Sequence, residues 1–358
     1  MKIVQILPEL NEGGVERGVV ELNREFVKNK IENFVITKGG KLAGIIEKDG
    51  GKVILHDVCS KNIFTAPVRI LKLRKILKEI RPDIVHIRSR VPAWMVHFAK
   101  PKCKIISTVH GANSVNFYSK IMVKADRIIV PSNFIKEYII KNFNADESRI
   151  SVIFRGVNLE NFDAAKFESK EKLRSEFGLK KDDFIISCVG RISNLKNIET
   201  IIKAIKILES KNVKLLVVGG VHSKRKKYFE FLRKLICKLD LKKSIIFLGS
   251  ISEIAKIYAL SDVVVSASIK PESFGRSVAE AIALNRPVVA SNHGGVKDII
   301  IEGVNGYFFA PLDEKELAQK ILMAKDLKFD GYYYIKSKFS LEKMCNENLK
   351  IYREILNA

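Results

Sequence analysis

The chain has 358 residues, of which 47% are hydrophobic and 29% are charged, and its formal net charge is +23. This length is sufficient for two ordinary domains, each with its own core. The composition excludes a disordered or fibrous protein, and no apolar run approaches the ~18 residues that a membrane-spanning helix needs.

Cysteine and histidine usage bounds the class of protein further. The 5 cysteines are scattered, odd in number and without a C-x-x-C pair. This argues against a disulfide framework or a zinc site and favours reduced thiols in a cytosol. The first apolar stretch is short and ends at Pro8, so we expect a strand there and not a signal peptide. Five histidines show no ligand spacing, so we expect no metal site from His56, His86, His97, His222 and His293.

The positive charge is shared by both halves of the chain. Lys and Arg exceed Asp and Glu by 28 − 17 = +11 in residues 1–165 and by 35 − 23 = +12 in residues 166–358. Such a charge favours anionic partners, namely phosphorylated substrates, an acidic membrane surface or nucleic acid. A lysine-rich surface that serves solubility explains it equally well.

Short β-branched runs alternate with amphipathic helical segments, which is the signal for parallel α/β units. Gly13-Gly14 precedes a predicted helix over 15–30, and a second helix over 68–80 carries an apolar stripe that the sheet needs. A plain loop is expected between the second and third strands. The strands predicted in the first half are 2–7, 33–37, 52–56, 83–88, 104–110, 127–132 and 151–158.

The polar stretch 159–175 is expected to connect two domains, because the strand–helix series restarts after it. A helix from about Asn197, a basic helix near 224–239 and a final helix at 341–356 are predicted here. The strands predicted in the second half are 184–191, 214–220, 245–249, 262–268, 287–291 and 306–310.

We therefore expect two Rossmann-like domains, 1–165 and 166–358, with ligands in a cleft facing the carboxyl ends of both sheets. A single large doubly wound sheet is the alternative, which the polar break disfavours.

The stretch 271–298 carries the clearest chemistry. Glu272 and Glu280 are eight residues apart, but Phe274-Gly275 breaks the chain between them, so only Glu280 is expected to be helical. The amides of Gly275, Arg276 and Ser277 would form the N-terminus of that helix, which favours an anion. A carboxylate accepts hydrogen bonds from both hydroxyls of a diol. Two carboxylates around an anion site suit a nucleotide sugar.

Two cations and two further positions accompany this stretch. Gly190-Arg191 ends a strand and Lys196 opens the next helix, where two cations would stabilise the charge of a departing diphosphate. Solvated basic residues are the competing reading, which the neighbouring carboxylates outweigh. Asn285 is expected to be a left-handed helix cap. The Gly294-Gly295 loop is either a phosphate contact or a tight turn.

The first half supplies its own candidates at strand ends. Gly13-Gly14 lacks the G-x-G-x-x-G fingerprint but would let the backbone approach a ligand. His110 ends a strand at the edge that faces the expected cleft. Arg88 and Arg90 would bind an anionic acceptor, unless packing of Trp94 explains their surroundings. The basic run 224–227 is an open candidate for contact with anionic lipid, whereas helix 68–80 is expected to be occupied by its sheet.

These residues form a pattern. ESFGRSVAEAIA with RPVVAS and GGVKDII resembles the retaining glycosyltransferases of family 4, which have the GT-B fold. The agreement covers nearly the whole chain and extends to Gly13-Gly14-Val15-Glu16, His110-Gly111, Arg155-Gly156-Val157-Asn158, Gly190-Arg191 and Lys196. The segment 84–94 and the FGR variant look like a subgroup that synthesises lipopolysaccharide and other envelope glycans.

The resemblance implies roles at the matched positions. Glu280 would hold the ribose diol, Glu272 the donor sugar, and Arg191 and Lys196 the diphosphate, while His110 would sit beside the transferred sugar. The family needs no metal or cofactor, and its final helix, here 341–356, packs on the N-terminal domain. The implied catalytic residues are His110, Arg191, Lys196 and Glu272; the implied donor-binding residues are Gly13, Gly14, Gly190, Phe274, Gly275, Arg276, Ser277 and Glu280; the acceptor candidates are Arg88 and Arg90.

Three positions depart from the usual family pattern. Asp298 stands where Glu is commoner, Asn285 replaces Gly, and Arg155 replaces Asn and adds a cation.

The expected activity is transfer of a hexose from a nucleotide sugar to a glycolipid acceptor at the cytoplasmic face of a membrane, by a cytoplasmic or peripheral enzyme. The alternatives are a soluble acceptor and a nucleotide-sugar epimerase. Nucleic-acid binding fits only the charge, because no recognition module or interleaved aromatic run supports it.

Overall fold

The computed structural model describes residues 1–11, 13–208, 212–221 and 226–357. The chain forms two compact units: Met1–Gly156 together with Leu341–Ala358, and Val157–Ser340. The units therefore join after Gly156, earlier than the 165/166 boundary expected from the sequence, and the final helix belongs to the first unit. Among the described residues, no helix is long and apolar enough to cross a membrane.

The first unit contains a seven-stranded parallel sheet in the order β3-β2-β1-β4-β5-β6-β7. Each strand follows one of the β-branched runs in the sequence, and the order reverses between β1 and β4, where Val4 lies opposite Val85. The strands are β1 Lys2–Ile6, β2 Glu32–Thr37, β3 Lys52–Leu55, β4 Ile84–Ile87, β5 Lys104–Thr108, β6 Arg127–Val130 and β7 Ile150–Val152.

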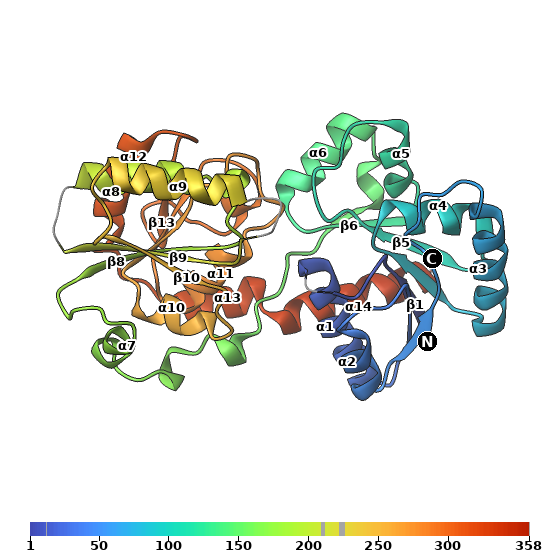
Figure 1. The fold of residues 1–358 in the computed structure, drawn as a ribbon. Helices are drawn as coiled ribbons and strands as arrows, with labels where there is room; N and C mark the ends of the chain where they lie inside the picture. The colour runs from blue at the N-terminus through green and yellow to red at the C-terminus, as the bar shows by residue number, and fades with distance from the viewer. Residues whose placement is uncertain (12, 209–211, 222–225, 358) are drawn as a thin grey trace. The chain divides into compact units, whose positions relative to one another are not determined.

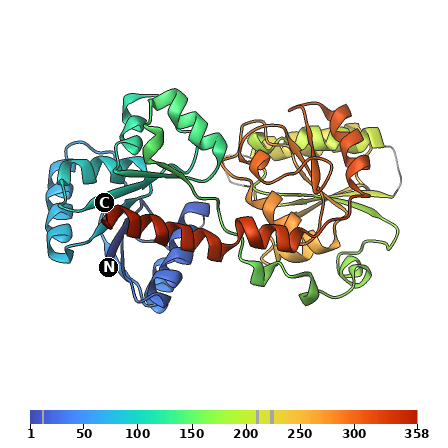
Figure 2. The ribbon, with the colours of Figure 1, turned by 180° about the vertical axis from the view of Figure 1, so that it is seen from behind.

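Helices cover both faces of this sheet (Figure 1). One core lies between the sheet and helices α3, α4 and α6, and another lies between the sheet and helices α1 and α14. Figure 2 shows α14 running alongside the N-terminal segment of the chain. The helices of this unit are α1 Gly14–Lys28, α2 Ala43–Lys48, α3 Ala66–Ile80, α4 Arg90–Ala99, α5 Phe117–Lys120, α6 Asn133–Phe143 and α14 Leu341–Asn357, with 3₁₀ turns at Ile121–Val123 and Glu147–Arg149.

The plain loop predicted between the second and third strands is wrong, because helix α2 lies there. Its side chain Ile46 is fully buried among Leu7, Leu10 and Val35. Tertiary packing of this single apolar residue outweighs the glycines around it, which had indicated a loop.

The second unit contains a six-stranded parallel sheet in the order β10-β9-β8-β11-β12-β13. Two separate sheets confirm the prediction of two Rossmann-like domains over the single-sheet alternative. The order reverses between β8 and β11, where Ile186 lies opposite Val263. The strands are β8 Phe184–Val189, β9 Val213–Val218, β10 Ile245–Gly249, β11 Val263–Ser266, β12 Val288–Ser291 and β13 Gly306–Phe309.

Helices α8, α9 and α12 pack on one face of the second sheet and enclose its main core, while α10, α11 and α13 cover the other face (Figure 1). The helices are α7 Lys170–Glu176, α8 Ile198–Leu208, α9 Lys226–Lys238, α10 Ile254–Leu260, α11 Arg276–Ala283, α12 Glu314–Ala324 and α13 Gly331–Phe339. The basic run 224–227 lies partly outside the described residues, and His222 lies outside them.

The stretch 159–175, expected as a plain connection, is structured. It contains 3₁₀ turns at Leu159–Asn161 and Ala164–Lys166 and most of α7. Helix α7 is held by Asp262, whose two carboxylate oxygens lie 2.5 Å from Lys170 Nζ and 2.7 Å from Arg174 Nη2. The charged residues that had indicated a linker therefore form ion pairs within the second unit.

Each sheet has one point where its strand order reverses, and loops leaving the carboxyl ends of the strands there form the usual ligand site of such folds. In the first unit β1 leads toward Gly13-Gly14 and β4 toward Arg88. In the second unit β8 leads to Gly190-Arg191 and β11 toward Glu272. Both sets of predicted site residues thus lie at reversal points.

Candidate active site

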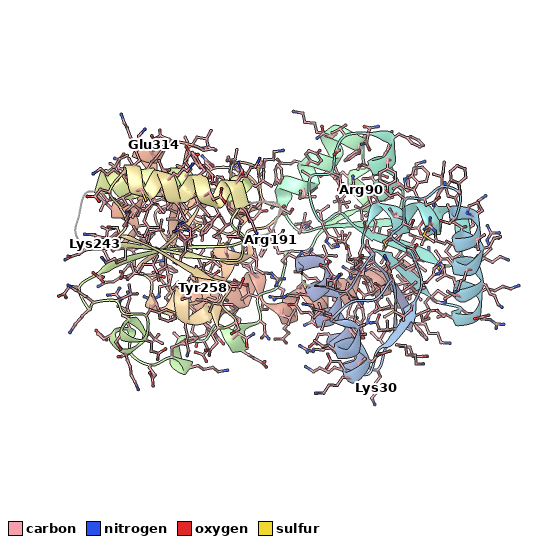
Figure 3. The ribbon with its side chains drawn as sticks, viewed as in Figure 1. Lys30, Arg90, Arg191, Lys243, Tyr258 and Glu314 are labelled. Atoms are coloured by element: carbon pink, nitrogen blue, oxygen red, sulfur yellow. The ribbon has the colours of Figure 1, made fainter. Side chains whose placement is uncertain are left out.

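In the second unit, the loop after β8 brings a lysine back over the strand end. Gly190 has φ 147°, and a 3₁₀ turn at Asn194–Lys196 follows Arg191. A Cβ atom on Gly190 would lie only 3.0 Å from Lys196 Cε, so the glycine makes room for the lysine stem. Arg191 itself is exposed to solvent (Figure 3).

Lys196 and Glu272 meet directly. Lys196 Nζ lies 2.7 Å from Glu272 Oε1, and the same oxygen accepts hydrogen bonds from Ser268 Oγ at 2.5 Å and Ser266 Oγ at 3.3 Å. Burial alone raises the pKa of Glu272, but the Lys196 charge and the two hydroxyls outweigh it and hold that pKa below its usual value. Glu272 is therefore a carboxylate at neutral pH. The two serines were not predicted from the sequence.

The backbone of Glu272 is fixed by the Gly294-Gly295 loop. Gly295 N donates to Glu272 O at 2.7 Å, and Gly294 has φ 79° with Glu272 N and O each 2.7 Å from where its Cβ would be. No other residue type fits this close approach. This loop thus serves as a tight turn that positions Glu272, and Asp298 ends the 3₁₀ turn that follows it.

Helix α11 begins where it was predicted, after a glycine with φ 107°. Its first intrahelical bond runs from Val278 N to Gly275 O at 3.0 Å, so the amides of Arg276 and Ser277 precede the hydrogen-bonded ladder. Phe274 is buried, with its ring centroid 5.8 Å from that of Phe339. Phe274 therefore anchors the loop from inside the unit.

Glu280 lies on α11 and is held from below by a tyrosine. The hydroxyl of Tyr258, on α10, donates to Glu280 Oε2 at 3.1 Å, and Tyr258 is fully buried. Burial and the Glu280 charge raise the pKa of Tyr258 well above its ordinary value, so it remains a donor. Sequence reasoning missed Tyr258, because nothing in α10 distinguishes it from a core aromatic. Asn285 has φ 58°, which confirms the predicted left-handed cap.

In the first unit, His110 follows β5 and is joined to the loop after β1 by Arg155. Arg155 Nη2 lies 2.7 Å from His110 Nδ1, and its Nη1 donates to Gly14 O at 3.1 Å. Gly13 caps α1 in an extended conformation, with φ −155°. The cation that departs from the family pattern thus links two predicted site positions.

Arg155 also determines the protonation of His110. A guanidinium is a donor only, so Nδ1 must be the acceptor and the neutral ring carries its proton on Nε2. Burial, Arg155, Arg88 and His86 all lower the pKa of His110, well below its ordinary value. Nε2 is buried, and it has no hydrogen-bond partner among the described residues.

Arg88 lies deeper in the first unit. It is buried, and it donates to Gln5 Oε1 at 2.6 Å and to Thr108 Oγ1 at 3.4 Å. Arg88 and His110 line the same small cavity of about 20 Å³. His86, also fully buried, bonds to Thr108 Oγ1 at 2.7 Å and to the Tyr352 hydroxyl of α14.

Arg90 takes a different direction from Arg88. It donates to Ser119 Oγ at 3.1 Å and lies over the ring of Tyr118. Trp94 Nε1 donates to Tyr118 O at 3.0 Å, so packing around Trp94 does account for Arg90.

The structure therefore brings together Gly190, Lys196 and Glu272 in one unit and Gly14, His110 and Arg155 in the other. In the part of the chain that the structure describes, no three His, Cys, Asp or Glu side chains are close enough to hold a metal ion.

Comparison with known proteins bears on this geometry. The model of Glycosyltransferase Family 4 matches residues 12–161, and that of Glycosyl transferases group 1 matches residues 169–330. A crystal structure of a glycosyltransferase from Rickettsia africae is 32% identical, covers 99% of this chain and 98% of its own, and superposes with a TM-score of 0.91. The chain belongs to the group 1 glycosyltransferases. The predicted GT-B fold is thereby confirmed.

Two further similarities place this glycosyltransferase among its relatives. A lipopolysaccharide 1,2-N-acetylglucosaminetransferase of Salmonella typhimurium is 27% identical over 74% of this chain and 72% of its own length. An Anabaena protein crystallised with UDP and glucose is 20% identical, covers 99% of this chain and 100% of its own, and has a TM-score of 0.83. The second likeness shows the shared fold.

Proposed function

We propose that this glycosyltransferase transfers a hexose from a nucleoside-diphosphate sugar to a membrane glycolipid, with retention of the anomeric configuration and without a metal. The observation that carries the donor half is the Lys196–Glu272 pair, 2.7 Å apart at the strand-order reversal of the second sheet. It sets one cation and one carboxylate side by side where a ligand with phosphates and hydroxyls would lie.

The donor would exchange partners with this pair. Lys196 moves from Glu272 to the diphosphate, and Glu272, kept ionised by its serines, accepts hydrogen bonds from the hydroxyls of the sugar. Glu280, held by Tyr258, accepts from the ribose diol, and the first amides of α11 face the phosphates. The Anabaena protein with UDP and glucose supports this ligand class through its shared fold.

The reaction follows from these positions. The bond between the anomeric carbon and the phosphate oxygen breaks, and the acceptor oxygen bonds to that carbon on the same face. The acceptor proton passes to the departing phosphate oxygen. Lys196 and Arg191 stabilise the charge that develops on the diphosphate. The Nε2–H of His110 is a donor for the transferred sugar, with its tautomer set by Arg155.

The name of the Salmonella relative supports a lipopolysaccharide-type acceptor. A soluble acceptor would keep the same chemistry in the second unit. Arg88 and Arg90, the acceptor candidates from the sequence, are held by contacts within the first unit and do not distinguish the two. Transfer assays with a glycolipid and with a soluble saccharide distinguish the two kinds of acceptor.

The donor is tested by thermal unfolding of the purified protein with a panel of nucleoside diphosphates and their sugars. A bound donor raises the unfolding temperature by mass action. Stabilisation by one sugar nucleotide and its loss in Lys196→Ala are expected, with Lys203→Ala as control, because Lys203 also pairs with a glutamate at 2.7 Å. Equal stabilisation of Lys196→Ala would remove Lys196 from the donor site.

Stereochemistry is tested on the product. The proton NMR coupling of the new anomeric centre should match that of the donor, and an inverted centre would overturn the retaining mechanism. A sugar nucleotide altered in the absence of any acceptor would indicate an epimerase instead.

A further inference from the structure

The charge of the first unit is concentrated in one segment. Residues 58–125 hold 14 Lys and Arg against 2 acids, Glu79 and Asp83, which is a net charge of 14 − 2 = +12. The rest of the first unit, residues 1–57, 126–156 and 341–358, holds 9 + 5 + 3 = 17 cations and 9 + 4 + 3 = 16 acids, a net charge of +1. The half-chain total had concealed this asymmetry. The segment contains strands β4 and β5, helices α3, α4 and α5, the 3₁₀ turn Ile121–Val123 and the loops between them.

Apolar side chains are exposed on the same segment. The exposed fraction of six of them runs from 49% at Phe98 to 87% at Phe64. We call the six the apolar patch: Ile63, Phe64, Val68, Leu71, Phe98 and Phe117. Exposed apolar groups gathered in one place indicate an interaction surface, whereas scattered ones do not.

Three members of the patch, Ile63, Phe98 and Phe117, are gathered around Trp94. Ile63 and Phe98 line one hollow of about 330 Å³ together with Trp94 and Tyr118, and no acidic residue lines it. The ring centroid of Trp94 lies 5.7 Å from that of Phe98 and 5.3 Å from that of Phe117. Helix α3 packs against α4 and contributes Ala66 and Ile70 to the same hollow, whereas Val68 lines a second hollow with Leu55.

Helix α3 has two apolar faces. The stripe predicted to pack on the sheet does so through Leu73 and Leu77, which are buried. The opposite side presents Val68 and Leu71 to solvent, followed on the same face by Lys75 and Lys78 at helical spacing. The sheet uses only the first face. The exposed face, apolar and then cationic, is the one that a lipid surface recognises.

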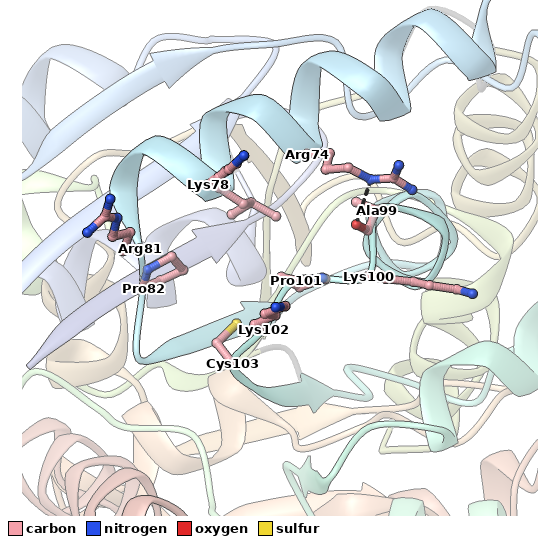
Figure 4. A pocket seen from close by; sticks show the side chains of 10 residues that line it. Arg74, Lys78, Arg81, Pro82, Ala99, Lys100, Pro101, Lys102 and Cys103 are labelled. Atoms are coloured by element: carbon pink, nitrogen blue, oxygen red, sulfur yellow. Dashed lines mark hydrogen bonds between the residues drawn. The ribbon is translucent and has the colours of Figure 1, made fainter.

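A cationic hollow continues the surface from the second half of α3 to α4. It has a volume of about 510 Å³, and no acid lines it (Figure 4). One of its cations is structural, since Arg74 donates to Ala99 O at 3.0 Å and to Phe98 O at 2.8 Å at the end of α4. The others are available to phosphate groups of lipids: Lys78, Arg81, Lys100 and Lys102.

We propose that the apolar patch and the exposed cations on α3 and just after α3 and α4 dock the first unit on an anionic lipid bilayer. These cations are Lys72, Lys75, Lys78, Arg81, Lys100 and Lys102. Charge complementarity selects an anionic surface, and the exposed aromatic and aliphatic side chains select a bilayer, in whose interface they can be buried. The proposal rests on the proposed glycolipid acceptor for its purpose, and it is tested without any sugar nucleotide.

The chain carries its own probe, because its 1 tryptophan, Trp94, lies against the patch. Vesicles of phosphatidylcholine with phosphatidylglycerol should shift Trp94 emission to the blue and sediment with the protein. Phosphatidylcholine alone should do neither, and high salt should release the protein. Equal binding to both kinds of vesicle, or binding to neither, would overturn the proposal.

Variants separate the two parts of the surface. Lys72→Gln/Lys75→Gln/Lys78→Gln should weaken partition by about a hundredfold. Its control, Lys234→Gln/Lys238→Gln/Lys242→Gln, removes three exposed lysines of the second unit and should change partition far less. Equal losses in both triple variants would mean that only total charge matters, which contradicts a defined surface.

Ile63→Ser/Phe64→Ser should weaken partition by roughly tenfold or more. Its control is Phe231→Ser/Val304→Ser, which removes two exposed apolar side chains of the second unit and should leave partition unchanged. If the Ile63/Phe64 variant binds vesicles as the wild type does but loses binding to a single-stranded oligonucleotide, the surface serves nucleic acid and the proposal is wrong.

All four variants should keep their thermal stabilisation by the nucleoside diphosphate. Failure of vesicle binding with intact sugar transfer to a soluble acceptor removes only the docking surface. Vesicle binding without any sugar transfer removes the proposed function.

Discussion

The two units share a topology, but the charged groups around their candidate site residues differ. At the strand-order reversal of the second sheet, a carboxylate and an ammonium lie 2.7 Å apart, and serine hydroxyls support the carboxylate. After β5, the strand next to the reversal of the first sheet, the basic neighbours of His110 are Arg155, Arg88 and His86, and each of them lowers its pKa. Burial is common to both sites, but only one has compensating charge.

This difference shows how a fold is adapted to two kinds of work. The Lys196 charge and the serine hydroxyls keep Glu272 ionised. The carboxylate can then accept hydrogen bonds from sugar hydroxyls, while Lys196 can bind phosphate. The surplus of positive charge keeps the His110 ring neutral. The ring therefore takes up no further proton, and its Nε2–H stays a hydrogen-bond donor. The same arrangement of strands thus supports a site that changes partners and a site that holds one protonation state.

The largest effect is expected from removing the cation of the compensated pair. Lys196→Ala should lower kcat by about 10²–10³, because the diphosphate loses stabilisation where its charge develops. Steady-state kinetics with the identified donor measure this, and Lys203→Ala should stay near the wild-type rate. An unchanged kcat would contradict the assignment of Lys196 to the diphosphate, and with it the role given to the charge pair of the second unit.

Glu280→Ala should weaken binding of the nucleoside diphosphate by about a hundredfold, because two hydrogen bonds from the ribose to a charged acceptor are lost. The turnover at saturating donor should change much less, since this binding is the same in the ground and transition states. Titration calorimetry measures the affinity, with the exposed Glu230→Ala as control. A fall in kcat alone would contradict the assignment.

The two sites should respond to pH in different windows. The folded-state pKa values of His86 and His110 lie well below 6.5, so below that pH the unfolded chain binds protons that the folded chain does not. Between pH 6.5 and about 5.5 the two histidines should remove about 2 kcal/mol from the free energy of unfolding. Urea unfolding followed by Trp94 fluorescence reports on the first unit.

The pH slope should be smaller in His86→Gln, and a wild-type stability that is flat over this window would contradict the neutral cluster. In the second unit the sign of the effect is the same, but its pH window is lower. The pKa of Glu272 is lowered, so its contribution is present above the ordinary value of 4.5 and is lost as pH falls below it.

The smallest effect is expected from Tyr258→Phe. Loss of the hydroxyl that donates to Glu280 should weaken nucleotide binding by about two- to tenfold. The effect should disappear in the Glu280→Ala background, because the tyrosine acts through that carboxylate. Additive losses in the double variant would show that Tyr258 does not act through Glu280.

Much of the fold could be predicted because its signals are local. Each strand follows a β-branched run, and the loop glycines at 190, 275 and 294 adopt the positive φ angles that only glycine accepts readily. Helix α2 was missed because its stability depends on one buried side chain, Ile46, which packs against residues distant in the sequence such as Leu7 and Val35.

The candidate site divides in the same way. Glu272, Glu280 and Lys196 could be found from motifs, but their partners Ser268 and Tyr258 could not, since a serine in a strand end and a tyrosine in an apolar helix have no distinctive pattern. Periodicity identified the inner stripe of α3. It gave no sign of the exposed pair Val68 and Leu71, because exposure depends on what the rest of the fold covers.

The hydrogen bond between His86 and Tyr352 has a consequence for the order in which the two units fold. The two residues are 266 positions apart in the chain, and α14 supplies one face of the core of the first unit. A ribosome that has made all seven strands of the first sheet has not yet made this helix. The second unit, complete at Ser340, is therefore expected to finish folding on the nascent chain before the first, which waits with an uncovered sheet face for the last helix.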